Sequence, residues 1–356
     1  MGRRIFFIPH FFLLAVLTAG AARAEFPTIA QDTERFFADM KSADWKGQYD
    51  LLVSMWAERC LRAGAAGIGQ LRTWLESGKD FDFTTGEWLE NGGTAANGMR
   101  ARIVLTLDRW PKDDALDVAQ RLLASTHNSE EAEAAVTQLE KHEPGRHRKA
   151  IFAKIRLWMM DETNPALQER AQHLFIQLAG QAGDAELLAE AEKFSSGALS
   201  TELAEAELRL PAEAARTAFT RLMKHPEFRE AVKMAAVTLP ENISYADAPA
   251  RDFAVQAIFP ALDPAAQQDF LSKLAVPYFS PASSAEAAKG AWVKEWTGER
   301  LIAEAKGRLA LLEALKKQVR APETKRAWQD ALGPLGRIAG GKWTEEDLPK
   351  APPPLG

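Results

Sequence analysis

Apolar side chains recur at helical spacing along almost the whole chain. Residues three and four apart lie on one face of a helix, so this pattern predicts amphipathic helices with one buried face each. The segment nearest to a strand is Ile103 to Leu107. Apolar and polar residues do not alternate along this segment. The stretch from Ala101 to Trp110 fits a helix ended by Pro111 equally well. We therefore expect an all-α fold.

Prolines mark several predicted helix starts, namely Pro111, Pro165, Pro211 and Pro264. At two of them, Asn164 and Asp263 precede the proline and can cap the helix, whose first position tolerates the missing N–H. The four prolines are 54, 46 and 53 residues apart, and an amphipathic segment follows at least the first three. Each interval leaves room for one further helix, which predicts a degenerate repeat of helix pairs.

Helix pairs that recur at about 40 to 50 residues are typical of α-solenoids, in which no pair can bury its apolar face alone. In this respect the region 111–279 resembles the HEAT-like helical-repeat proteins, although it lacks the consensus residues of tetratricopeptide or ankyrin repeats. The resemblance implies a scaffold with a concave face for a protein partner. The alternative is an irregular helical bundle whose helix starts fall at similar intervals by accident.

The regions on either side differ in composition. Residues 25–110 are rich in tryptophan and glycine and are expected to form a helical cap or small domain. Residues 280–339 begin with a serine- and proline-rich loop and continue as a charged helical region. Residues 340–356 form a proline-rich tail that we expect to be exposed and flexible.

The first residues, 1–24, have the three parts of a cleavable signal peptide. Arg3 and Arg4 precede an apolar run, and Ala22 and Ala24 supply small residues before Glu25. The run is shorter than the roughly 20 residues of a membrane-spanning helix. We expect a periplasmic or secreted protein with no membrane span after cleavage. The paired arginines also resemble a twin-arginine signal, whose cargo often carries a cofactor.

Removing this signal moves the formal charge from −5 to −8, because the segment holds three arginines and no acid. An acidic chain without a basic patch predicts that nucleic acid is not a partner. Cys60 is the single cysteine, so an internal disulfide is excluded and the core must supply the stability. We read Cys60 as a buried hydrophobe rather than an intermolecular thiol.

The sequence contains no motif with the ligand spacing of a known metal or cofactor site. Zinc needs closely spaced histidine or cysteine ligands, and His142 and His147 are separated by a turn-like Pro144-Gly145. The stretch from Asp80 to Gly86 has alternating oxygen ligands, but its glycine is in the wrong register for a calcium loop. It predicts a turn with solvated acids. We expect neither a metal nor a cofactor.

Glu76 is a weak candidate for catalysis. The pair Glu76-Ser77 resembles the Glu-Ser core of lytic transglycosylases, which cleave the cell-wall glycan with one carboxylic acid. Such an acid needs a raised pKa in an apolar cleft. The family's glycine-rich segment after this pair is missing, and Glu76 to Gly78 also fits a helix C-terminus followed by a loop.

Tryptophan is frequent, with ten in the chain against three tyrosines. Trp292 and Trp296 share a helix face at i and i+4, where they could bind a sugar ring or a partner helix, or could close a core seam.

Three functional hypotheses remain from these patterns. The favoured one is a non-enzymatic scaffold for a protein partner. The others are a glycan-cleaving enzyme that uses Glu76 and a cofactor-carrying twin-arginine cargo.

Overall fold

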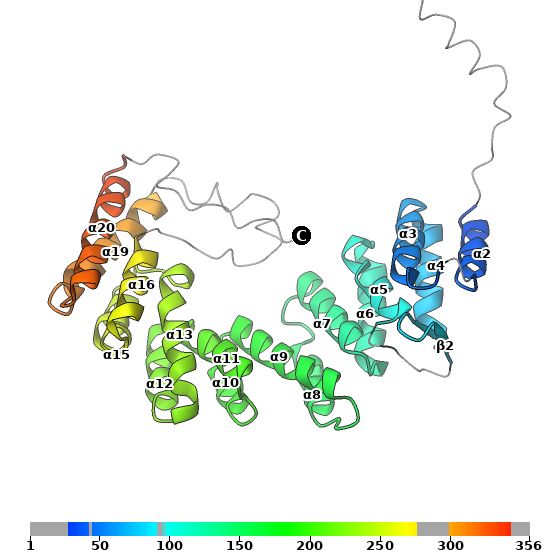
Figure 1. The fold of residues 1–356 in the computed structure, drawn as a ribbon, viewed down its shortest axis with the longest axis horizontal. Helices are drawn as coiled ribbons and strands as arrows, with labels where there is room; N and C mark the ends of the chain where they lie inside the picture. The colour runs from blue at the N-terminus through cyan, green and yellow to red at the C-terminus, as the bar shows by residue number, and fades with distance from the viewer. Residues whose placement is uncertain (1–27, 43–44, 91–94, 96, 276–298, 343–356) are drawn as a thin grey trace, which may run out of the picture. The chain divides into compact units, whose positions relative to one another are not determined.

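Helices make up nearly all of the regular structure in the computed structural model, which confirms the predicted all-α class. The structure describes residues 28–42, 45–90, 95, 97–275 and 299–342 (Figure 1). The chain divides into two units after His147. This division falls inside the region 111–279 that the repeat pattern predicts. No helix in the described ranges combines the length and the apolar character that a bilayer span requires.

The first unit contains helices joined by one short hairpin. Its elements are α2 (Ile29–Asp39), α3 (Tyr49–Arg62), α4 (Ala65–Glu76), β1 (Asp80–Asp82), β2 (Glu87–Leu89), α5 (Met99–Val104), the 3₁₀ helix η2 (Leu107–Arg109), α6 (Lys112–Ser125) and α7 (Ser129–His142). Helices α2, α3 and α4 pack on one another, α5 packs on α3, α4 and α7, and α6 packs on α7. The segment for which a single helix was predicted, Ala101 to Trp110, is divided between α5 and η2.

The β-hairpin was not predicted. Strands β1 and β2 are antiparallel, with Phe81 paired with Trp88. Gly86 closes the turn with a φ of 74°, in the left-handed region that glycine adopts without strain. Each strand has only three residues, too few for an alternating pattern to reveal them.

Gly67 in α4 allows a close approach of this helix to α3. A Cβ on Gly67 would lie 1.9 Å from the carbonyl oxygen of Cys60 in α3, so only glycine permits this approach of the two helices. Cys60 itself is fully buried, and burial raises the pKa of its thiol to about 12. The expected role of Cys60 as a small core residue is confirmed.

The second unit consists of helices that follow one another in chain order (Figure 1). They are α8 (Arg148–Met159), α9 (Pro165–Ala182), α10 (Ala185–Ala191), α11 (Ala198–Leu208), α12 (Ala212–Leu222), α13 (Pro226–Asn242), α14 (Ala248–Phe253), α15 (Phe259–Ala261), α16 (Pro264–Leu274), α19 (Glu299–Leu315) and α20 (Pro322–Ala339). A π-helical stretch, η3 (Ala254–Ile258), joins α14 to α15 and precedes Pro260, which has no N–H to donate.

Neighbouring helices of this unit pack as pairs, and the pairs pack on one another. Helix α8 pairs with α9, α10 with α11, α12 with α13, and α19 with α20. Helices α9, α11, α13, α16 and α20 each contact the next in that order, so they form one continuous row. The chain in this unit is thus an array of helix pairs in which contacts run mainly between neighbours.

The repeat is shorter than the proline spacing predicted. The first helices of three successive pairs begin at Arg148, Ala185 and Ala212, which are 37 and 27 residues apart. The predicted starts are found: helices follow Pro111 and Pro211 directly, and Asn164 and Asp263 cap α9 and α16 through their side chains. Two further helices, not one, lie in each of the first two proline intervals, and α13, α14 and the short α15 lie in the third. The prolines therefore do not mark the starts of successive helix pairs.

Candidate functional site

Glu76, the candidate catalytic residue, is the last residue of α4 and is held by two arginines. Its Oε1 accepts hydrogen bonds from Nε of Arg72 at 3.0 Å and from Nη1 of Arg121 at 2.5 Å. Arg72 also binds the carboxylates of Asp114 and Asp117 in α6. The side chain of Glu76 is 39% exposed. The predicted helix end is confirmed, because Ser77 is the C-cap of α4.

This environment differs from that of a glycosidic general acid. A general acid must donate its own proton, and it is kept protonated by an apolar, desolvated surrounding. Both groups that bind Glu76 are guanidinium donors, which pair with a carboxylate acceptor. The geometry of Glu76 is therefore that of a member of an ion-pair network between α4 and α6.

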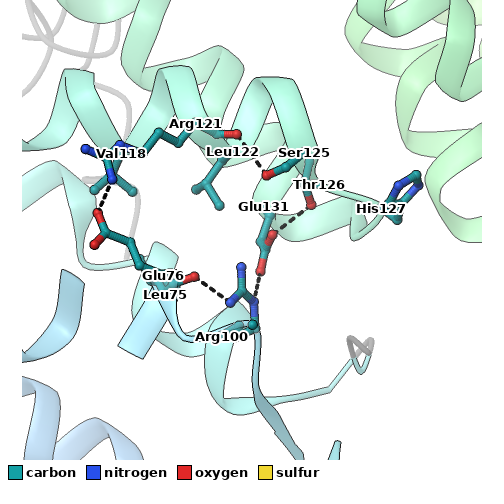
Figure 2. A pocket seen from close by; sticks show the side chains of 11 residues that line it. Leu75, Glu76, Arg100, Val118, Arg121, Leu122, Ser125, Thr126, His127 and Glu131 are labelled. Atoms are coloured by element: carbon teal, nitrogen blue, oxygen red, sulfur yellow. Dashed lines mark hydrogen bonds and ion pairs between the residues drawn. The ribbon is translucent and has the colours of Figure 1, made fainter. Parts of the chain in front are cut away.

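A pocket of about 430 Å³ lies next to Glu76 (Figure 2). Leu75 at the end of α4 and Val118 and Leu122 of α6 form its apolar walls. Its polar lining comes from Glu76, Arg100, Arg121, Ser125, Thr126, His127 and Glu131. The volume is within the range of about 300 to 1,000 Å³ that is usual for small-molecule sites.

A buried ion pair forms the inner wall of this pocket. Nε of Arg100, in α5, donates to Oε1 of Glu131, in α7, at 2.5 Å. Nη1 of Arg100 donates to the carbonyl oxygen of Leu75 at 2.6 Å, and the hydroxyl of Thr126 donates to Oε2 of Glu131 at 2.7 Å. A buried charge pair persists only when such additional bonds satisfy its atoms. Here both carboxylate oxygens have a donor.

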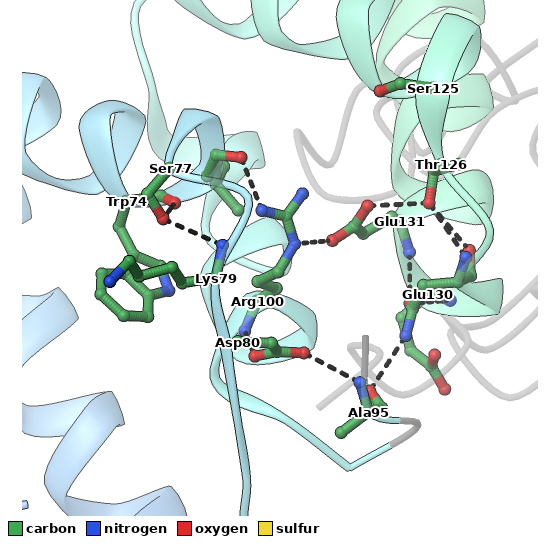
Figure 3. A network of polar contacts seen from close by, with 12 residues as sticks. Trp74, Ser77, Lys79, Asp80, Ala95, Arg100, Ser125, Thr126, Glu130 and Glu131 are labelled. Atoms are coloured by element: carbon green, nitrogen blue, oxygen red, sulfur yellow. Dashed lines mark hydrogen bonds and ion pairs between the residues drawn. The ribbon is translucent and has the colours of Figure 1, made fainter. Parts of the chain in front are cut away.

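Asp80 extends this network to the hairpin (Figure 3). The side chain of Asp80 accepts from the backbone N–H groups of Phe81, Ala95 and Arg100, at 2.8, 3.0 and 2.9 Å. Burial raises the pKa of Asp80, and these three donors partly offset the rise. The side-chain amide of Asn128 donates to the carbonyl of Ala95 at 3.0 Å, which ties the start of α7 to the same loop.

The predicted turn with solvated acids is therefore corrected. Asp80 is fully buried and organises the packing of three segments, and only Asp82 fits the prediction. The N–H of Thr84 donates to Asp82 at 2.7 Å and holds the pKa of that carboxyl below its usual range. Within the described ranges, no three His, Cys, Asp or Glu side chains are grouped so that they could hold a metal ion.

The histidines near the end of α7 interact with other groups. Nε2 of His147 lies 2.6 Å from Oε2 of Glu143. Burial, together with the charges of Lys141 and Lys112, lowers the pKa of His142. The two histidines thus have separate surroundings.

Three tryptophans of the first unit, Trp56, Trp74 and Trp110, are buried, whereas Trp45 and Trp88 are partly exposed. The rings of Trp56 and Phe36 stack with centroids 4.5 Å apart, and both residues are fully buried. Trp74 contacts Trp88 edge to face, with centroids 5.6 Å apart. The predicted tryptophan site, Trp292 and Trp296, lies outside the described residues, as do the predicted signal peptide and residues 343–356 of the predicted tail.

Another buried carboxylate, in the second unit, was not found by sequence reasoning. Glu207 of α11 is fully buried, and its Oε1 accepts from Nη2 of Arg221 at 2.6 Å. Arg221 also binds Glu192 at the end of α10. Oε2 of Glu207 has no hydrogen bond among the residues that the structure describes. Burial raises the pKa of Glu207 to about 7; Arg221 opposes this rise and Glu192 adds to it.

Comparison of the chain with protein-family models, with curated proteins and with solved structures finds no match.

Proposed function

We propose that this chain is an exported, non-enzymatic helical-repeat protein that binds a protein partner in the periplasm or outside the cell. The observation that carries the proposal is the continuous row of α9, α11, α13, α16 and α20 in the second unit. An array whose pairs contact mainly their neighbours leaves an extended surface along each row, and repeat proteins use such surfaces to bind partners. A HEAT-like solenoid is the architecture that we propose for this array.

Large apolar side chains exposed on this array support partner binding. Met234, in α13 of the row, is 56% exposed, and Leu157 and Met160 at the end of α8 are 63% and 77% exposed. Methionine is flexible and polarisable, which suits it to adaptable contacts with a partner. These residues are the positions at which we expect a partner to be contacted.

The candidate chemistry also favours a binding role over catalysis. Glu76 is engaged by two arginines, and the buried acids Asp80 and Glu131 accept two or more hydrogen bonds each within the first unit. Carboxylates that are bonded in this way contribute to packing and binding, and their bonded oxygens are not available to exchange protons with a substrate.

Affinity capture of the full-length chain from the extracytoplasmic fraction of its host tests the proposal. We expect a stoichiometric protein partner that binds again after separate purification. We also expect Met234→Asp to weaken this binding by at least about tenfold, a cost of roughly 1.4 kcal/mol. Glu313→Gln, at an exposed position of α19, is the matched control. A chain that is recovered alone, or a complex that Met234→Asp leaves unchanged, would contradict the proposal.

A further inference from the structure

The pocket of the first unit contains a hydrogen-bond donor that no described residue uses. Arg100 is buried, and its Nε and Nη1 bind Glu131 and Leu75. Its Nη2 has no hydrogen-bond partner within the described part of the chain, and Figure 2 shows this nitrogen directed toward the centre of the pocket. Nη2 of Arg100 is not one of the fully buried, unpartnered atoms of the described residues, so it is open to the pocket, where water or a ligand oxygen can accept from it.

An unused acceptor belongs to the same pocket. Both hydrogen bonds to Glu76 go to Oε1, so Oε2 accepts none from the described residues. Glu76 also lines the pocket. A ligand in the pocket can thus accept from Arg100 and donate to Glu76.

The charges around the pocket select for a neutral ligand. Its lining contains two arginines, Arg100 and Arg121, and two glutamates, Glu76 and Glu131, and each arginine is bonded to one of these glutamates. An added anion would face the two carboxylates, and an added cation would face the two guanidinium groups. In a partly desolvated site either arrangement is unfavourable.

We propose that this pocket binds a neutral polyhydroxylated ligand, a monosaccharide or a disaccharide. A hydroxyl both donates and accepts hydrogen bonds, so one class of ligand satisfies Arg100 and Glu76 without bringing a charge. The apolar walls formed by Leu75, Val118 and Leu122 provide a surface for the C–H groups of the sugar ring. The site lies wholly in the first unit, so the proposal is independent of partner binding by the array of the second unit.

Titration of the full-length chain with small probes, followed by calorimetry or by saturation-transfer NMR, tests this assignment. The neutral probes are glucose, N-acetylglucosamine and maltose. Succinate, putrescine and alanine present an anion, a cation and a zwitterion. We expect at least one neutral probe to bind saturably, and the charged probes to bind at least about tenfold more weakly.

Three variants locate the binding. Ser125→Trp fills the pocket from the end of α6, and Arg100→Lys keeps the charge of Arg100 while removing Nη2. Both should weaken sugar binding by at least about tenfold. Ser54→Trp, at an exposed position of α3 away from the pocket, should leave it unchanged. Far-UV circular dichroism and the thermal midpoint of each variant separate loss of binding from loss of folding. Absence of binding by all three sugars, preferential binding of a charged probe, or full binding by a folded Ser125→Trp variant would overturn the proposal.

Discussion

Arg308 and Glu304 form a buried ion pair within α19, with 2.8 Å between Nε and Oε1. The same guanidinium donates to the carbonyl oxygens of Pro240 near the end of α13, at 2.5 Å, and of Leu274 at the end of α16, at 3.1 Å. The last carbonyls of a helix have no partner inside the helix. One side chain of α19 therefore satisfies the ends of two other helices.

Replacement of Arg308 should destabilise the second unit strongly. Arg308→Met leaves Glu304 without its cation and two helix ends without their donor, and we expect a loss of about 3 to 5 kcal/mol in the free energy of unfolding. Arg308→Lys should recover only part of this loss, because one ammonium cannot reproduce the planar set of donors. Urea unfolding measures both variants. The control is Arg326→Met, whose arginine side chain is 86% exposed; equal stability of the two Met variants would contradict this interpretation.

Two glycines of α4 provide a matched pair. Gly67→Ala would place a Cβ 1.9 Å from the carbonyl oxygen of Cys60, so α3 and α4 must move apart. We expect a loss of about 1 to 3 kcal/mol, the usual cost of overpacking. Gly69 lies in the same helix with open space around it, and Gly69→Ala should stabilise the chain by about 0.5 to 1 kcal/mol. Thermal unfolding that ranks the two variants in the opposite order would exclude the close contact.

Glu207 should make the stability of the second unit depend on pH. Its pKa is raised to about 7 in the folded state, against about 4.3 in an unfolded chain. Between these values the folded state binds more protons than the unfolded state, so the free energy of unfolding falls as pH rises through this window. The fall for a single group is at most about 4 kcal/mol.

The substitution Glu207→Gln removes the ionisable group and keeps its shape. We expect urea unfolding of the variant to lose this component of the pH dependence between about pH 5 and pH 8, and the variant to be more stable than the parent at pH 8. Glu205→Gln is the control, because Glu205 lies in the same helix and pairs with Arg209. A parent chain that is more stable at pH 8 than at pH 5, with the same profile in Glu207→Gln, would be inconsistent with a raised pKa.

The proposed export predicts that the signal segment is cleaved from the mature chain. Intact-mass measurement of the protein from the extracytoplasmic fraction should show a chain that begins at Glu25. Ala24→Glu should block cleavage, because the site requires a small residue before the bond. Replacement of Arg3 and Arg4 by lysine should leave export unchanged if the general secretory route is used. Recovery of the uncleaved chain from the cytoplasm alone would rule out the export prediction.

Local signals in the sequence were sufficient to predict the all-α class and several helix starts. Asn164 and Asp263 cap helices where the polar residue before a proline predicted it, since a cap involves only residues three or four apart. The helix count between prolines was wrong because not every helix begins at a proline: Asn128 caps the 14-residue α7 without one, and α10 has only seven residues. Gly183 ends α9, and Asp184 caps the seven-residue α10. Both residues lie within a stretch rich in alanine and glutamate.

The polar sites could not be predicted in this way, because their partners are distant in the sequence. Asp80 accepts from Ala95 and Arg100, and Glu304 binds the backbone of Tyr245, 59 residues away. A buried acid and a solvated acid look alike in one sequence, and only the fold shows which donors surround each of them. The charge of Arg100 likewise gives no sign that one of its nitrogens is directed into a pocket.

The central claim, that the helix row of the second unit contacts a protein partner, is tested most directly by site-specific photocrosslinking in the living host. A photoreactive amino acid is placed at Met234 in the row, at Met160 beside α8, and at Glu313 of α19 as an exposed control. We predict that positions 234 and 160 crosslink to the same protein partner and that position 313 does not. No crosslinked protein at either position, or equal crosslinking at all three, would contradict the account.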